Sequence, residues 1–302
     1  MPLLAVNHHY FREEAPGQGI YPTLPDALVK QLQVIRQNWR IGNELDLIKY
    51  CDGEIQANDN VCLLTFDDGL KEQIDAIKFL DKYDSTALCF VSTAPIVNHK
   101  MLDVHKLHMI RSCFNDEELA KSLEQKFTFT SYDFDDDLLA IQYRYDSTVS
   151  RRVKYFLNFV LEKEAKDVWI SEIFTEMFGC EKEACQKLYM DSDDLKYLAK
   201  RHILGTHAHQ HLPLATLSDD ESRQEIMESL DIIETLSGKV VEGISYPYGG
   251  KSAVSDKVFS IAGECGLKYG FTMERGINKK VNNPLSLMRI DTNDVAEWNM
   301  KQ

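Results

Sequence analysis

Short apolar runs alternate with amphipathic stretches along much of this sequence, and this alternation restricts the possible folds more than any other feature. An apolar run of about four to eight residues is typical of a buried strand, and a longer stretch with apolar residues every three or four positions is typical of a helix. Strand-like runs lie at 61–66, 86–92, 202–207, 240–247 and 267–272. The alternation predicts βα units around a largely parallel sheet.

Helical patterns fill the intervals between these runs. They cover 70–83, 191–201, 218–238 and 256–266. The third begins at Ser218, whose hydroxyl suits a helix N-cap, and ends at Gly238, which suits the C-terminal end of a helix. A possible first strand contains 6–10, and a possible closing strand lies in 287–294.

One block interrupts the alternation. From about residue 100 to about residue 187 the sequence becomes charged and helical. Apolar residues form two stripes there, one at 153–161 and one at 169–178, while 131–138 is read as a surface connection with solvated acids. The 302 residues suffice for one large α/β domain or two small ones. We expect a single domain over 1–302 with a helical insertion at about 100–187.

Composition narrows the classes of partner. The chain has 34 basic and 48 acidic residues, a formal net charge of −14, which argues against a general surface for nucleic acid or for acidic membranes. No apolar run approaches the roughly 20 residues of a membrane span. The first residues, MPLLAVNHHYFREE, resemble no signal peptide, and the seven cysteines are scattered, so we expect a cytoplasmic protein with reduced thiols.

Two adjacent carboxylates follow the strand-like run VCLLTF. Asp67 and Asp68 stand at its carboxyl end, and Gly69 after them permits a tight turn into the next helix. The carboxyl ends of parallel strands face a common crevice, which makes the pair a candidate site. Asp-Asp-Gly also suits an ordinary turn and helix cap, so the motif alone leaves both interpretations open.

Three histidines follow another strand-like run. The stretch LGTHAHQHLPL contains His207, His209 and His211. Two histidines four positions apart can converge on one ion from a helical turn or a curled loop, whereas a strand would align all three on one face. We favour a metal site that Asp68 completes. Three protein ligands with open positions are typical of a catalytic metal rather than a structural one.

A third polar element follows the run 240–247. The stretch SYPYGG, residues 245–250, is rich in proline and glycine. Backbone N–H groups of such a loop can stabilise a developing oxyanion, although the stretch by itself is also an ordinary turn.

Together these elements resemble the polysaccharide deacetylase family, also called the NodB homology family. TFDDG is similar to its first motif, HAHQH to its HxxxH second motif and YPYG to the tail of its third. The resemblance covers roughly 60–98 and 189–291. It implies a distorted (β/α) barrel and metal-dependent hydrolysis of an N-acyl or O-acyl group on a sugar.

The resemblance also implies roles for individual residues. Asp67 would be the general base, and Asp68, His207 and His211 would bind one divalent transition metal. Zinc is expected first, with cobalt, nickel, manganese or iron as alternatives. Tyr248 would offer its backbone N–H to the oxyanion.

Other residues are expected to contact substrate or to orient groups in the site. His209 and Tyr246 are assigned to the loops that meet the substrate. The third motif of the family commonly starts with arginine, where this chain has Ser245. Arg289 and Asp291, in the possible closing strand, are expected to orient groups in the site instead.

The general acid that protonates the leaving amine is the catalytic residue that the sequence defines least. The family commonly uses a late histidine, but no histidine follows His211 in this chain. His9, on the possible first strand, is the leading candidate, and His105 and His108 are alternatives if the insertion folds over the crevice.

Three functions are compatible with these features. We expect a metal-dependent deacetylase of a small activated or lipid-linked sugar. A non-catalytic carbohydrate-binding or scaffold protein on the same barrel is the first alternative, and a metal-dependent amidase of a non-sugar substrate is the second. The sequence leaves the oligomeric state open.

Overall fold

The computed structural model describes residues 2–16, 19–54 and 59–296. The chain divides into two compact units. The first comprises Met1–Ala15, Pro22–Lys100 and Lys182–Gln302, and the second comprises Pro16–Tyr21 and Met101–Glu181. That the whole chain forms one catalytic domain with an insertion at about 100–187 stays a prediction.

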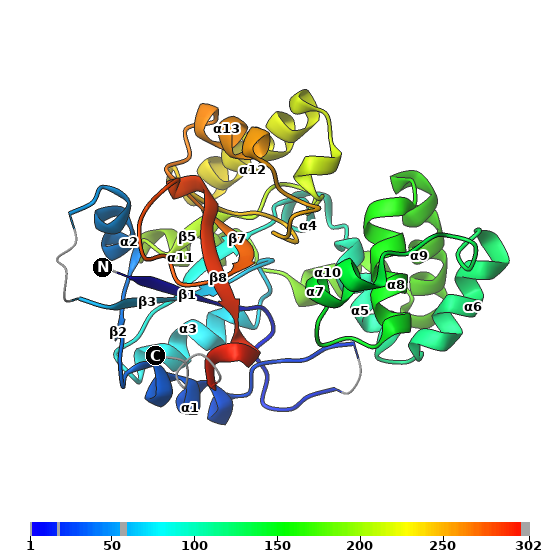
Figure 1. Ribbon diagram of the computed structural model, residues 1–302, viewed down its shortest axis with the longest axis horizontal. Helices are drawn as coiled ribbons and strands as arrows, with labels where there is room; N and C mark the ends of the chain where they lie inside the picture. The colour runs from blue at the N-terminus through cyan, green and yellow to red at the C-terminus, as the bar shows by residue number, and fades with distance from the viewer. Residues whose placement is uncertain (1, 17–18, 55–58, 297–302) are drawn as a thin grey trace. The chain divides into compact units, whose positions relative to one another are not determined.

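A parallel barrel forms the centre of the first unit (Figure 1). Its strands are β1 (Leu3–His8), β2 (Arg40–Ile41), β3 (Val61–Phe66), β4 (Leu88–Val91), β5 (Leu204–Thr206), β6 (Gly243–Ser245), β7 (Tyr269–Arg275) and β8 (Leu287–Asp291). The sheet runs β1-β8-β7-β6-β5-β4-β3-β2, and β1 also pairs with β3 along its whole length. Seven strands therefore close into a barrel, with β2 beside the beginning of β3. This confirms the expected α/β barrel.

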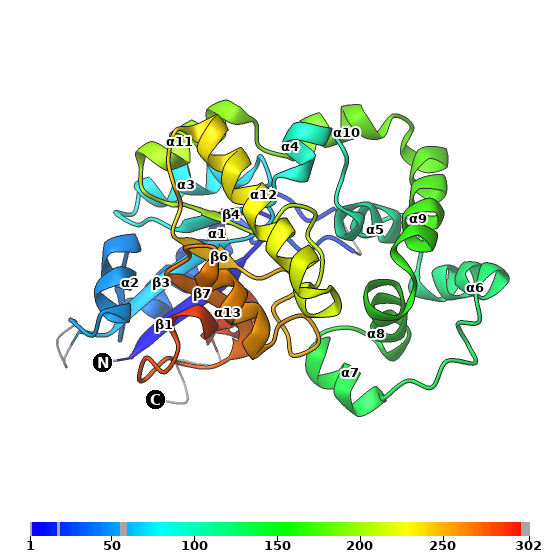
Figure 2. The same cartoon turned by 90° about the horizontal axis from the view of Figure 1, so that it is seen from above.

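Helices cover the outside of the barrel (Figures 1 and 2). They are α1 (Pro25–Ile35), α2 (Glu44–Cys51), α3 (Gln73–Asp81), α4 (Ala94–Asn98), α11 (Ser192–Lys200), α12 (Asp219–Ser237) and α13 (Asp256–Glu264). A further helix, α10 (Glu181–Leu188), precedes α11 in the sequence. The predicted caps of α12 are confirmed: the Ser218 side chain accepts a hydrogen bond from the Glu221 N–H, and Gly238 has φ 74°. Because helices cover the barrel, strands such as β3 are buried on both faces and consist mostly of apolar residues.

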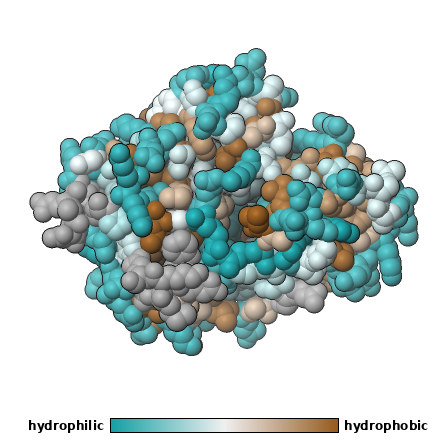
Figure 3. Space-filling model, viewed as in Figure 1, coloured by the Kyte–Doolittle hydropathy of each residue, from teal (hydrophilic) through white to brown (hydrophobic). Residues whose placement is uncertain are grey.

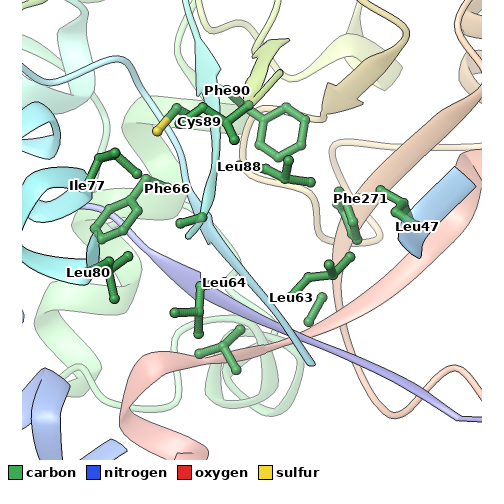
Figure 4. Packing of buried hydrophobic residues seen from close by; sticks show 14 of the residues in the cluster. Leu47, Leu63, Leu64, Phe66, Ile77, Leu80, Leu88, Cys89, Phe90 and Phe271 are labelled. Atoms are coloured by element: carbon green, nitrogen blue, oxygen red, sulfur yellow. The ribbon is translucent and has the colours of Figure 1, made fainter. Parts of the chain in front are cut away.

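Alternate side chains of β3 face opposite ways (Figure 4). Phe66 lies beside Ile77 of α3, outside the barrel. Leu63 lies on the other side, toward Phe271, whose ring is 5.7 Å from that of Phe90. The period of two then carries Asp67, like Leu63, toward the barrel interior.

The second unit is helical. It contains α5 (Asp103–Arg111), α6 (Asp116–Lys126), α7 (Asp136–Gln142), α8 (Thr148–Tyr155), a π-helical segment (Phe156–Val160) and α9 (Lys163–Phe178). Val153 and Phe156 from the first predicted stripe are buried, as are Trp169 and Phe174 from the second. These side chains give the unit a hydrophobic core of its own.

Hydrophilic residues predominate on the face shown in Figure 3, as the large number of charged residues predicts. Within the described ranges, no helix combines the length and the apolar character needed to cross a bilayer.

Candidate metal centre and active site

Asp67 and Asp68 follow β3 directly, in a loop that only glycine can continue. Asp68 has φ 82°, and Gly69 has φ 75°. A Cβ atom at position 69 would lie 2.6 Å from Val91 Cγ1, so a larger residue would collide with β4. The Met190 N–H donates to the Gly69 carbonyl at 3.0 Å and ties this loop to the chain before α11.

The histidines after β5 lie in a curled loop. Ala208 and His211 have φ 58° and 59°, left-handed values that turn the chain back on itself. His207 Nε2 and His211 Nε2 each lie 3.3 Å from Asp68 Oδ1, and all three residues are buried. Sequence reasoning left open a helical turn or a curled loop, and the curled loop is the one observed.

A backbone carbonyl fixes the orientation of His207. Its Nδ1 donates a hydrogen bond to the Ser245 carbonyl at 2.6 Å, which leaves Nε2 directed at Asp68. Burial alone would lower the pKa of His207, but the carboxylates of Asp67 and Asp68 outweigh it and raise the pKa. Such a contact to the second nitrogen is what orients a metal-binding histidine.

These residues fit a divalent metal. The ligand atoms of Asp68, His207 and His211 all lie within 4.8 Å of one another. A tetrahedral metal with bonds of about 2.0–2.2 Å separates its ligand atoms by roughly 3.3 Å, which matches the two 3.3 Å distances to Asp68. Two imidazoles and one carboxylate suit several transition metals, and the identity of the metal is open.

His209 has a different environment from its two neighbours. Its Nδ1 lies 2.8 Å from Thr93 Oγ1, and its Nε2 lies 3.4 Å from Asn98 Nδ2 and 3.2 Å from Glu228 Oε1. The ring is buried among these polar groups. His209 does not belong to the cluster of possible metal ligands that Asp68, His207 and His211 form. Its role in binding substrate stays a prediction.

Asp67 is held by an arginine from β8, which is separated from β3 by β1 alone. Arg289 Nη1 lies 3.0 Å from Asp67 Oδ1, Arg289 Nη2 lies 2.8 Å from Oδ2, and the Ser245 hydroxyl donates to Oδ2 at 2.9 Å. Burial would raise the pKa of Asp67, but Arg289 and His207 outweigh it and hold the pKa below its usual value. The carboxylate is therefore charged and fixed in orientation.

Polar groups of the barrel interior surround Arg289, whose side chain is fully buried. It donates to Asn7 Oδ1 at 3.0 Å, Thr65 Oγ1 at 3.1 Å and the Thr272 carbonyl at 3.0 Å. Sequence reasoning missed Asn7 and Thr65. Their signal was present, because both are polar residues inside otherwise apolar strands.

His9 follows β1 at the same end of the barrel. It is half-buried, and its charge when protonated contributes to lowering the pKa of Asp67, after Arg289 and His207. Gln73 Nε2 donates to the backbone carbonyls of both His9 and Asp67, at 2.9 and 2.5 Å. The alternative acids His105 and His108 belong to α5 of the second unit. The role of each as general acid stays a prediction.

The remaining expected site residues differ in their surroundings. Tyr248 has φ 61°, and its ring lies 4.8 Å from that of His211. Tyr246 is buried, and its hydroxyl donates to the Leu285 carbonyl at 2.9 Å. Asp291 accepts hydrogen bonds from the backbone and side chain of Asn293, at 2.8 and 2.7 Å. Their catalytic and substrate-binding roles stay predictions.

Comparison with known proteins agrees with this site. The family model described as polysaccharide deacetylase matches residues 158–270, which include His207, His211 and the YPYG loop. Asp67 and Asp68 lie outside that range, but the fold brings them to the same place. A search of curated proteins finds no match.

Several solved structures share the fold. The de-N-acetylase from Aggregatibacter actinomycetemcomitans has a TM-score of 0.60 and 12% identity, over 99% of this chain and 100% of that one. IcaB from Ammonifex degensii has a TM-score of 0.60 and 14% identity, over 99% and 97%. The Streptococcus pyogenes deacetylase PplD, solved with acetate, has a TM-score of 0.58 and 18% identity, over 98% and 97%. The chain therefore matches the polysaccharide deacetylase model over residues 158–270, and its fold is similar to that of several solved deacetylases.

Proposed function

We propose that this protein is a metal-dependent hydrolase that removes an acetyl group from the nitrogen of an acetylated sugar. The observation that carries the proposal is the buried group of Asp68, His207 and His211 beside a charged carboxylate, Asp67, that is bound by arginine. A cluster of carboxylates and imidazoles of this kind is costly to bury unless it has a function.

The chemistry divides between the metal and the side chains. A divalent metal held by Asp68, His207 and His211 would acidify water and polarise the acyl carbonyl. Asp67 accepts a proton from the water whose oxygen forms a bond to the acyl carbon. Arg289 keeps the Asp67 carboxylate oriented for this transfer. The Tyr248 N–H would donate to the oxyanion that develops on the carbonyl oxygen.

The reaction is completed when the C–N bond breaks and the nitrogen takes a proton. We assign this proton to His9, which is near enough to Asp67 to affect its pKa. The products are acetate and a free amine on the sugar. A small activated or lipid-linked sugar as substrate and a cytoplasmic location stay predictions.

Acetate release with and without metal tests the proposal. Purified protein is treated with chelator, dialysed and assayed on N-acetylglucosamine oligomers before and after addition of zinc, cobalt, nickel, manganese or iron. We expect activity to disappear with the chelator, to return with at least one metal and to be absent from Asp67→Asn. His202→Asn is the control, because His202 is exposed and does not belong to the candidate metal cluster.

Two outcomes would contradict the proposal in different ways. Binding of the sugar without acetate release under any metal favours a carbohydrate-binding or scaffold protein. Metal-dependent hydrolysis of cyclic imides or ureides, with no activity on acetylated sugars, favours an amidase of a non-sugar substrate.

A further inference from the structure

A cavity in the second unit has the features of a small-molecule site. It has a volume of about 290 Å³, and its lining includes Tyr21, Arg111, Asp116, Tyr145, Asp146 and Ser150. This volume is just below the range of roughly 300–1,000 Å³ for small-molecule sites. It suits one ring of a ligand rather than a large cofactor.

Arg111 gives the cavity a buried charged group that is not fully bonded. Only 5% of its surface is exposed. Its Nε and Nη2 donate to the two oxygens of Asp116 at 2.7 and 3.0 Å, and Nη2 also lies 2.5 Å from Ser150 Oγ. Among the described residues, Nη1 has no hydrogen-bond partner. Nη1 itself is shielded from solvent, so Arg111 offers a ligand the Asp116 carboxylate and the Ser150 hydroxyl that it holds in the lining of the cavity.

The lining of the cavity is acidic. It contains the carboxylates of Asp116, Glu117 and Asp146 and one cation, Arg111. Arg111 pairs with Asp116, and Lys154, which lies outside the lining, places its Nζ 2.7 Å from Asp146 Oδ2. The carboxylates disfavour a phosphate or other anion, and their oxygens can accept hydrogen bonds from the hydroxyl groups of a neutral ligand.

Two aromatic rings stand beside these polar groups. Tyr21 is 70% exposed and Tyr145 is 55% exposed. The Arg144 guanidinium lies 4.9 Å from the centre of the Tyr145 ring and helps to hold it in place. An exposed tyrosine offers an apolar face and a polar hydroxyl, which match the C–H face and the hydroxyl groups of a sugar ring.

We propose that this cavity binds one pyranose ring of a neutral oligosaccharide. The second unit would then be a saccharide-binding module with a site of its own, made of residues other than those assigned to hydrolysis. The inference depends on the composition of the cavity, and it can stand or fall independently of the proposed deacetylation.

The test measures binding in the full-length chain. The Asp67→Asn variant keeps an acetylated probe intact, and the probes are the N-acetylglucosamine tetramer and cellotetraose, which has no acetyl group. Isothermal titration gives the Kd, and the shifts of the assigned Ser147 and Asn115 amide signals locate the ligand at the cavity. The binding variant carries Tyr21→Ala and Tyr145→Ala. The control carries Ile141→Ala, at a residue of the same unit that is 78% exposed.

We expect at least one tetramer to shift the two amide signals and to bind at least tenfold more weakly to the double tyrosine variant, with the Ile141→Ala control unchanged. In an otherwise wild-type chain, the tyrosine changes should leave acetate release from a small acetylated monosaccharide unaltered. Equal binding by all variants, no shift at millimolar probe, or shifts caused by calcium but by neither sugar would overturn the proposal. If the wild-type chain shows no hydrolysis but still binds a tetramer at the cavity, the result supports this site and contradicts only the proposed deacetylation.

Discussion

Arg289 of β8 and Asp67 after β3 form a fully buried ion pair, although 222 positions separate them in the sequence. Both guanidinium Nη atoms contact the carboxylate, at 3.0 and 2.8 Å. Ser245, which stands where the related motif has arginine, lies between them: its hydroxyl accepts from Arg289 and donates to Asp67, both at 2.9 Å. The guanidinium that orients the carboxylate therefore comes from the strand that closes the barrel.

This arrangement predicts an order of effects for Arg289 and Ser245. Arg289→Met leaves Asp67 charged, buried and without its main partner, so we expect about 3–5 kcal/mol of lost stability and a fall in kcat of about 100-fold or more. Ser245→Ala removes the hydroxyl that bonds both Arg289 and Asp67, about 1.5–3 kcal/mol for each bond, but leaves the ion pair in place, and should lower kcat about tenfold. Steady-state kinetics and urea unfolding measure both effects.

A surface ion pair is the control for this comparison. Arg223, which is exposed and pairs with Glu264, should tolerate the change to Met with little effect on kcat or stability. Full kcat in Arg289→Met would show that Asp67 does not depend on this guanidinium.

Two glycines with nearly the same φ allow the cost of backbone strain to be measured apart from the cost of a steric collision. Gly69 has φ 75° and Gly238 has φ 74°, but an added Cβ meets Val91 at 2.6 Å only at position 69, whereas nothing lies within 4 Å at position 238. We expect Gly238→Ala to lower stability by about 1–2 kcal/mol. Gly69→Ala should cost a further 1–3 kcal/mol or so, because the loop beside Asp68 must shift. Equal unfolding free energies for the two variants would contradict the collision.

The local elements of this fold were predictable because their signals are local. The run VCLLTF corresponds to β3 without any change of boundary, and Ser218 and Gly238 bracket α12 as expected. The two-residue strand β2 is too short to show any periodicity. The pairing of Arg289 with Asp67 also could not be derived, because it depends on closure of the barrel by β1 and β8.

Loop geometry limited the prediction of the histidine site. The spacing of His207 and His211 predicted shared ligation, but the sequence could not show how His209 would be directed between them. The positive φ values at Ala208 and His211 determine that outcome, and non-glycine residues adopt such values only when the surrounding structure holds them there.

His8 predicts a pH dependence of stability. Burial, with a smaller contribution from His9, lowers the pKa of His8 to about 3, and Asp67 opposes this only in part. The folded chain therefore keeps His8 neutral, while the unfolded chain protonates it below about pH 6.5. Its stabilising contribution is complete above pH 6.5 and is lost as the pH falls toward 3.

Urea unfolding between pH 7.5 and pH 5 measures this contribution. Each pH unit below about 6.5 costs at most about 1.4 kcal/mol, so the wild type should lose up to about 2 kcal/mol more than His8→Leu over this range. The variant keeps an apolar contact with Phe66, on which the His8 ring stacks at 5.1 Å. Parallel pH profiles for the two proteins would contradict a neutral His8.

A substitution at His209 distinguishes a structural role of this side chain from a role in binding substrate. Its nitrogens lie near Thr93, Asn98 and Glu228, of which only Thr93 is buried, so His209→Ala should leave the Thr93 hydroxyl without this partner and lower stability by about 1–3 kcal/mol. Metal content should stay at the wild-type value. An increase in KM with no change in the unfolding midpoint would instead favour the predicted contact with substrate.

Metal stoichiometry of the purified chain tests the central claim most directly. Elemental analysis compares the wild type with three single variants. These are Asp68→Ala, His207→Ala and the control His202→Asn. We predict about one equivalent of a divalent transition metal in the wild type and the control, and loss of that metal in the other two variants. A wild-type protein that contains no transition metal and takes none up on titration would contradict the account.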